Sequence, residues 1–236
     1  MTLMKPDLDR FVGIMDEWAK VAAELQGEDL KQKIYDNTLL DLCGDLKDKK
    51  VLDYGAGPGV IAKRIARVGA RVHAYDVSPD MLRIAAQNLG SEKVHTNVSE
   101  VTNGSFDIVF CNLVVCIVPE EEVVRIARNI RAALTEKGKA YVGFCNPKLY
   151  NVPESLIDFR HSTGDDYEQN HKYRKTKKEG NYDIDELHRP IGWYQGIWNS
   201  IGLKCTKVAF TPEYATRDGK RISDFIIFEL VRGESP

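Results

Sequence analysis

Three glycines and two acids stand where a small ligand could be held. Gly55, Gly57 and Gly59 follow a short apolar run that contains Asp53, and Asp76 ends the next apolar run. Glycines allow the backbone to turn sharply and to approach a ligand closely, because they carry no side chain. A carboxylate such as Asp76 can accept hydrogen bonds from both hydroxyls of a ribose. The pattern therefore indicates a site for a ligand that contains a nucleoside.

Alternating strands and helices must position these residues. Apolar runs predict strands at 50–54, 71–76, 94–98, 106–111 and 140–145. Helices are predicted between them, from the period of Ile61 and Ile65, from the cap and turn residues Ser78 and Pro79, and from the acids after Pro119. Parallel strands need crossover connections, which are usually helices. The chain is therefore an α/β protein with a doubly wound, mostly parallel sheet, and such a sheet binds ligands beyond the carboxyl ends of its strands.

Further segments precede and follow this core. Helices are predicted over 8–26 and about 29–46, and the polar, charged segment after strand five is interpreted as an inserted lid or hairpin. A helix begins after Pro190, and two strands, about 204–211 and 223–231, pair antiparallel because their connection is too short for a crossover. We expect one domain over 1–236 with seven strands and an antiparallel last strand. Its parts are cap helices at 1–46, the ligand-binding core at 47–145, the lid or substrate region at 146–189, and the C-terminal helix and strand pair at 190–236.

Charge and composition exclude several classes of protein. The net charge of −2 gives no field that would attract a polyanion, which argues against nucleic acid as the main partner. The apolar stretches fall far short of the ~20 residues of a membrane span, and the N-terminus lacks the apolar core of a secretory signal. Five scattered cysteines without a Cys-x-x-Cys pair are expected to be small buried residues, with no metal site. We expect a cytoplasmic protein.

The glycine loop resembles that of one enzyme family. The segment 53–59, Asp-Tyr-Gly-Ala-Gly-Pro-Gly, matches the acid-x-Gly-x-Gly-x-Gly loop of the class I S-adenosylmethionine-dependent methyltransferases. Segment 76–82 is similar to the second-strand motif of that family, 106–109 to its fourth strand and 134–139 to its turn before strand five. The antiparallel final strands agree as well. The resemblance covers roughly 45–145 and 190–231.

The resemblance implies a set of residues that bind S-adenosyl-L-methionine. The three glycines would line the methionine part, Asp53 would orient its ammonium group, Asp76 would hold the ribose, and Met81 would pack on the adenine. Many relatives have an aspartate where this chain has Asn97, which could instead be an ordinary turn residue; Asn112 would face the methionine end or cap its strand. The full set is Asp53, Gly55, Ala56, Gly57, Gly59, Asp76, Val77, Met81, Asn97, Val98 and Asn112.

The family shares a cofactor motif but no common catalytic residue, because methyl transfer is an in-line displacement that mainly needs alignment. His188 is the candidate base or substrate-orienting residue, since it precedes a helix and a histidine side chain can titrate near neutrality. The alternative is that it only shapes the start of that helix. Tyr35 is a second catalytic candidate, and Trp18 could cover the substrate, although both could be core residues. The predicted substrate-binding residues are Trp18, Tyr173, Arg189 and Tyr194.

The predicted activity is transfer of a methyl group to an oxygen or nitrogen atom of a small molecule. An RNA methyltransferase would use the lysine run 172–178 with Tyr173, which could equally be a solvated hairpin face. A partner subunit that binds the cofactor without turnover is a further alternative. A nicotinamide-dependent oxidoreductase is disfavoured, because its third glycine would fall on Val60. The oligomeric state stays open.

Overall fold

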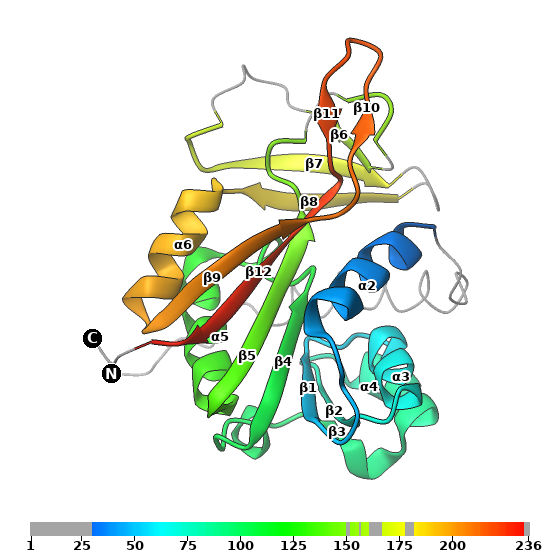
Figure 1. The fold of residues 1–236 in the computed structure, drawn as a ribbon, viewed down its shortest axis with the longest axis vertical. Coiled ribbons are helices and arrows are strands. Elements are labelled where there is room, and N and C mark those ends of the chain that lie inside the picture. Colours follow the sequence, from blue (N-terminus) through cyan, green and yellow to red (C-terminus); the bar gives the residue numbers. More distant parts are fainter. Residues whose placement is uncertain (1–29, 150–151, 156, 161–166, 178–181, 234–236) are drawn as a thin grey trace.

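The core of the protein is a seven-stranded sheet (Figure 1). The computed structural model describes residues 30–149, 152–155, 157–160, 167–177 and 182–233. The strands, in their order across the sheet, are β3 (Val94–His95), β2 (Arg71–Tyr75), β1 (Lys50–Tyr54), β4 (Phe106–Asn112), β5 (Leu134–Cys145), β12 (Phe225–Arg232) and β9 (Leu203–Phe210). β1 to β5 pair parallel, and β12 runs antiparallel to both of its neighbours. The predicted doubly wound sheet with an antiparallel last strand is confirmed.

Helices cover both faces of the sheet (Figure 1). One face carries α2 (Leu30–Cys43), α3 (Val60–Arg67) and α4 (Pro79–Leu89), and the other carries α5 (Glu120–Ala133) and α6 (Ile191–Ser200). The buried apolar residues accordingly form two clusters, one with Leu39 and Ile65 and one with Ile130 and Trp198. The predicted helix at 8–26, together with Trp18, lies outside the described residues. No helix in the described part of the chain is long and apolar enough to cross a membrane.

Local chemistry sets where the helices begin. Ser78 is extended and its side chain accepts a hydrogen bond from the backbone N–H of Met81, and Pro79 occupies the first turn of α4. Proline is tolerated there because the first N–H groups of a helix have no intrahelical partner. α5 begins with three glutamates after Pro119, at the end where the helix dipole favours negative charge. Both starting points agree with the sequence prediction.

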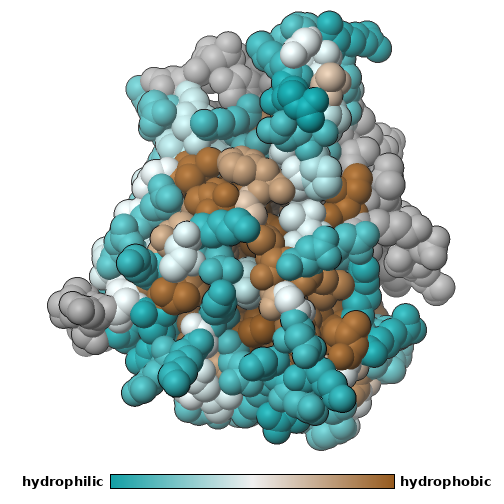
Figure 2. Space-filling view, viewed as in Figure 1, coloured by the Kyte–Doolittle hydropathy of each residue, from teal (hydrophilic) through white to brown (hydrophobic). Residues whose placement is uncertain are grey.

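A second, smaller sheet lies beyond the carboxyl ends of β4 and β5 (Figure 1). It consists of β6 (Ile157–Arg160), β7 (His171–Lys177) and β8 (Tyr182–His188), all antiparallel. A short hairpin of β10 (Tyr214–Ala215) and β11 (Arg221–Ile222) stands beside it. The predicted lid segment thus forms a sheet. In the space-filling view hydrophobic side chains gather in a band below these upper strands (Figure 2).

Two strands differ in length from the prediction. β3 ends at His95 instead of continuing to residue 98, because Asn97 caps a 3-10 helix, η2 (Val98–Glu100); another, η1 (Ser91–Lys93), precedes β3. β5 begins at Leu134, which is already extended and pairs with Phe106, so the predicted turn at 134–139 is the first part of the strand. A register shift between Phe106 and Ile108 accommodates the extra residues of β5.

Candidate functional site

The glycine-rich loop joins β1 to α3 in a left-handed backbone conformation. Gly55, Gly57 and Gly59 have φ angles of 77°, 52° and 75°. A Cβ atom at Gly55 would lie 2.4 Å from Cγ2 of Val114, and one at Gly59 would lie 3.1 Å from Cβ of Ala85. At Gly57 a Cβ atom would meet no described atom within 4 Å. Only glycine suits these φ values, and at Gly57 the described part of the chain leaves room for a ligand against the backbone.

Asp76 fixes this loop to the next strand. Its side chain is 3% exposed; Oδ2 accepts a hydrogen bond from the Gly57 N–H at 2.8 Å, and Oδ1 accepts one from the Ser78 N–H at 2.9 Å. The N–H groups of Gly55 and Ala56 both donate to the carbonyl of Tyr75. Burial raises the pKa of Asp76, and the backbone N–H groups partly offset that rise. A carboxylate has about four acceptor positions, so this one can still accept from a ligand hydroxyl.

Asp53 carries a buried oxygen that lacks a partner. The side chain is 1% exposed, and Oδ2 has no hydrogen-bond partner among the described residues. Burial, followed by the charges of Asp76 and Asp36, raises the pKa of Asp53 to about 7, although the amide of Ala62 lowers it. A buried carboxylate without a counter-charge is unfavourable. A cationic group of a ligand at this position would therefore relieve an existing cost.

Asn112 and Tyr35 meet at the carboxyl end of β4. The Tyr35 hydroxyl, which comes from α2, donates to Oδ1 of Asn112 at 2.5 Å. Nδ2 of Asn112 is buried and has no partner in the described part of the protein. Burial raises the pKa of Tyr35 well above 10, so its hydroxyl stays protonated and serves as a donor. In this contact the hydroxyl is a hydrogen-bond donor, and the catalytic role predicted for Tyr35 stays a prediction.

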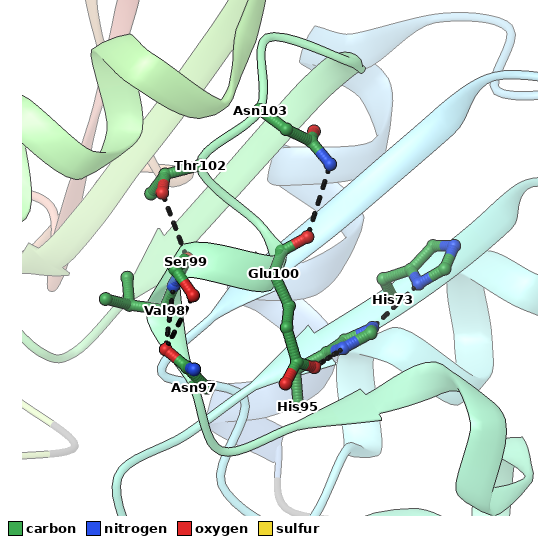
Figure 3. A network of polar contacts seen from close by, with 8 residues as sticks. All are labelled: His73, His95, Asn97, Val98, Ser99, Glu100, Thr102 and Asn103. Atoms are coloured by element: carbon green, nitrogen blue, oxygen red, sulfur yellow. Dashed lines mark hydrogen bonds and ion pairs between the residues drawn. The ribbon is translucent and has the colours of Figure 1, made fainter.

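The residues predicted to contact the adenine end of the cofactor lie on or just before α4 and after β3. Met81 is buried, and Val77 and Val98 are partly buried against the apolar cluster that contains Ile130 and Trp198. Asn97 is exposed, and its Oδ1 already accepts hydrogen bonds from N–H and Oγ of Ser99 (Figure 3). Asn97 thus forms a turn, as in the alternative given for it, and its contact with the adenine stays a prediction.

A histidine pair beside this end was not identified from the sequence. Nδ1 of His73 lies 2.9 Å from Nε2 of His95, and Nδ1 of His95 lies 2.8 Å from a carboxylate oxygen of Glu100 (Figure 3). Burial, and next the neighbouring His95, lower the pKa of His73. The pair depends on the register of β2 and β3, in which Ala74 faces Val94. That register was not deduced from the sequence.

His188 ends β8 and is 4% exposed. Its Nε2 lies 2.8 Å from the backbone carbonyl of Tyr167, and the two rings pack edge to face. A carbonyl can only accept, so Nε2 carries the proton and a base role would fall to Nδ1. The catalytic role of His188 stays a prediction.

Arg189, which follows β8, joins the small sheet to the loop after β4. Its guanidinium donates to the carbonyls of Val115 and Val118 at 3.0 and 2.9 Å, and the N–H of Leu187 donates to the carbonyl of Cys116. The side chain is 4% exposed and its guanidinium stacks on Trp193. These bonds give Arg189 a clear structural role, and its predicted contact with substrate stays a prediction.

Replacing Arg189 by methionine is expected to destabilise the fold by about 2–4 kcal/mol, because two carbonyls would lose their donor in a buried place. Urea unfolding measures this change. Arg217→Met is the matched control, since that side chain is 90% exposed and we expect a change of about 0.5 kcal/mol or less. Equal stability of the Arg189 variant and the wild type would contradict the role described.

The remaining residues predicted to bind substrate lie in different surroundings. Tyr194 is 1% exposed and packs against Phe144 and Trp198 in the core. Tyr173 belongs to β7, but its side chain lies outside the described residues, as does Trp18. Lys172, the described part of the basic run, pairs with Asp185 at an exposed position. Substrate contacts of these residues stay predictions.

The described cysteines and acids form no cluster typical of a metal centre. Cys111, Cys116 and Cys145 are buried, as expected for cysteines in apolar runs. No group of three potential ligands is gathered within the described segments.

Comparison with known proteins agrees with the fold and the loop. The family described as "Methyltransferase domain" matches residues 52–142. A ubiquinone biosynthesis O-methyltransferase of Xanthomonas oryzae is 28% identical over 151 residues, which is 59% of this chain and 61% of that protein. The chain thus matches about three-fifths of the length of such curated relatives.

Solved structures extend the likeness over most of the chain. An S-adenosylmethionine dependent methyltransferase from Mesorhizobium loti has a TM-score of 0.60 at 17% identity, covering 85% of this chain and 97% of that one. The 1,6-didemethyltoxoflavin-N1-methyltransferase of Burkholderia thailandensis, solved with its substrate and S-adenosylhomocysteine, has a TM-score of 0.63 at 14% identity over 99% and 93% of the two chains. Residues 52–142 thus match the methyltransferase domain family and the chain has the class I fold, so the resemblance predicted from its motifs is confirmed.

Proposed function

We propose that this protein binds S-adenosyl-L-methionine and transfers its methyl group to an oxygen or nitrogen nucleophile of a small organic molecule. The observation that carries the proposal is Oδ2 of Asp53, which is buried at the end of β1 beside the left-handed glycine loop and has no partner in the described part of the chain. That atom is suited to a cationic group, and the loop is suited to a ligand that lies against its backbone.

The described residues fit the parts of this cofactor. Asp53 would accept from the ammonium group, and Asp76 would accept from the ribose hydroxyls with the lone pairs that the loop leaves unused. Met81 and Val98 would pack against the adenine. In this arrangement the ammonium group of the cofactor would meet the buried anion of Asp53, and its two ribose hydroxyls would meet the carboxylate of Asp76.

The chemistry requires little of the chain beyond alignment. The bound cofactor supplies a methyl group on a positively charged sulfur, which is a good leaving group for in-line displacement. The residues of this chain would hold the reacting atoms in line and exclude water, and the loop between β4 and α5, anchored by Arg189 to the lid, would form one wall.

Two observations support a small-molecule acceptor. The relatives compared above include a protein named for ubiquinone biosynthesis and one named for a didemethyltoxoflavin substrate. The lid strands lie over the carboxyl ends of the sheet, above a band of hydrophobic side chains (Figures 1 and 2). A hydrophobic surface at this end of the sheet suits an organic molecule better than a polyanion.

Isothermal titration with S-adenosylmethionine and S-adenosylhomocysteine tests the cofactor, with NAD and NADP as controls. We expect micromolar dissociation constants for the adenosyl ligands and no heat from the nicotinamides. Tritium transfer from methyl-labelled cofactor to phenolic, catecholic and heteroaromatic amine acceptors then tests the reaction. Absence of adenosyl binding would refute the proposal.

The proposed contribution of His188 can be separated from cofactor binding. We expect His188→Ala to leave the dissociation constant of S-adenosylhomocysteine within about threefold and to lower kcat about 100-fold, in the range of general base catalysis. Steady-state kinetics with an identified acceptor, alongside titration, gives both numbers. Unchanged kcat would exclude His188 as the base and leave its contact with Tyr167 as its role.

A further inference from the structure

The Tyr35 hydroxyl lies close to β5 and the end of β4 because Gly143 has no side chain that would occupy its place. Asn112 of β4 and Gly143 of β5 are register partners. A Cβ atom at Gly143 would lie 1.8 Å from the Tyr35 hydroxyl oxygen, so no other residue could stand there without displacing the tyrosine. The ring packs edge to face on Phe225 with centroids 5.4 Å apart. The hydroxyl is thus held directly over the end of β4.

The hydrogen bond from this hydroxyl decides which way the Asn112 amide faces. An asparagine side chain has one oxygen and one NH₂ group that occupy nearly equivalent places, and its hydrogen bonds select between the two orientations. A phenol that donates requires the acceptor Oδ1 on its side, and here it donates at 2.5 Å. Nδ2 is therefore turned away from Tyr35, and among described atoms it has no partner.

Asn112 and Asp53 belong to the same face of the sheet. Asp53 is the register partner of Phe110, and Asn112 follows Phe110 by two residues, which returns to the same face of a strand. Phe110 packs in the apolar cluster that contains Tyr35. On the face covered by α2, Oδ2 of Asp53 is thus a buried acceptor and Nδ2 of Asn112 a buried donor that find no partner among the described residues.

We propose that Tyr35 is a positioning residue that orients the Asn112 amide so that Nδ2 donates to the carboxylate at the amino-acid end of the bound cofactor. This assignment rests on the proposed function. The ammonium group of the cofactor would donate to Oδ2 of Asp53, and its carboxylate would accept from Nδ2 of Asn112. Both buried atoms would then have a hydrogen-bond partner. Tyr35 itself does not touch the reacting atoms, and it connects helix α2 to the site.

The test compares two ligands that differ only at that end. S-adenosylhomocysteine carries the amino-acid group, whereas 5′-methylthioadenosine keeps the adenosine and the thioether but lacks it. We expect Tyr35→Phe to weaken S-adenosylhomocysteine about tenfold in titration, or ~1.4 kcal/mol, and to leave methylthioadenosine within about twofold. Tyr141→Phe is the matched control, because it removes the hydroxyl of another buried tyrosine in the same cluster. It should change neither ligand.

A second variant tests the orientation itself. Asn112→Asp offers Tyr35 an acceptor on either side and removes the Nδ2 donor, so it should weaken S-adenosylhomocysteine by about 30-fold or more. Adding Tyr35→Phe to that variant should cost less than about twofold further, since no amide is left to orient. Fully additive losses would overturn the assignment.

The outcomes also separate this inference from the proposed function. Equal weakening of both ligands by Tyr35→Phe, or no weakening of either, would overturn the role of Tyr35 while leaving cofactor binding by the wild-type protein intact. Failure of the wild-type protein to bind either ligand would overturn the proposed cofactor, and the positioning role with it.

Discussion

Replacing Asp53 by asparagine is expected to stabilise the ligand-free protein and to weaken cofactor binding. The pKa of Asp53 is about 7 in the folded protein against 3.8 for an unperturbed aspartate. The folded state therefore binds the proton more tightly than the unfolded state, and the stability associated with that proton is lost as the pH rises from about 4 through 7. At pH 8 asparagine removes the buried charge, for a gain of roughly 2–4 kcal/mol.

Urea unfolding at two pH values measures this effect. The gain from Asp53→Asn should be larger at pH 8 than at pH 5.5 by about 2 kcal/mol, because the wild-type carboxyl is largely protonated at the lower pH. Asp41→Asn, at an exposed position of α2, is the control and should show no such difference. A gain that does not depend on pH would contradict the raised pKa.

The same variant should bind S-adenosylhomocysteine at least about 30-fold more weakly, since a neutral amide replaces the partner of the ammonium group. A more stable protein that binds less well is the expected signature of a residue kept for its ligand. Undiminished affinity in titration would remove Asp53 from the site.

The second large effect is expected for Asp76→Ala. The Asp76 carboxylate accepts hydrogen bonds from the N–H groups of Gly57 and Ser78, and in the proposed site it also accepts from the ribose hydroxyls. The substitution removes the ribose contact and releases the loop, so we expect the affinity for S-adenosylhomocysteine to fall about 100-fold or more, in line with the loss of two charge-assisted hydrogen bonds. Titration measures the fall.

Two variants control for this experiment. Asp80→Ala removes an exposed acid from the first turn of the same helix, α4, and should leave the affinity within about twofold. Asp76→Asn keeps the volume and one acceptor, and should lie between the wild type and the alanine variant. Wild-type affinity in Asp76→Ala would show that the ribose is held elsewhere.

The order of elements could be predicted because it follows from local patterns. Strand-forming runs, the caps at Ser78 and Pro119, and the glycine spacing each act within a few residues, and together they define the sheet and the loop. The beginning of β5 was placed too late because Glu136, Lys137 and Gly138 resemble a turn; the strand already begins at Leu134, and these three residues lie in the irregularity between the pairs Phe106–Leu134 and Ile108–Lys139.

The contacts inside the site could not be predicted in the same way. Tyr35 and Asn112 are 77 residues apart, and their bond depends on the space at Gly143, which nothing near Tyr35 in the sequence indicates. Arg189 was predicted to bind substrate; its donors bind the carbonyls of Val115 and Val118, a structural role that the sequence did not indicate, and its contact with substrate stays a prediction. Such pairings depend on distant packing.

The position of β12 also has a consequence for how the chain folds. This strand follows β9 in sequence, yet it lies between β5 and β9 and pairs with both. During synthesis on the ribosome, β5 therefore exposes an unpaired, largely apolar edge until β12 has emerged. The sheet cannot be completed before that late segment is available, and an unpaired strand edge is a site at which chains aggregate.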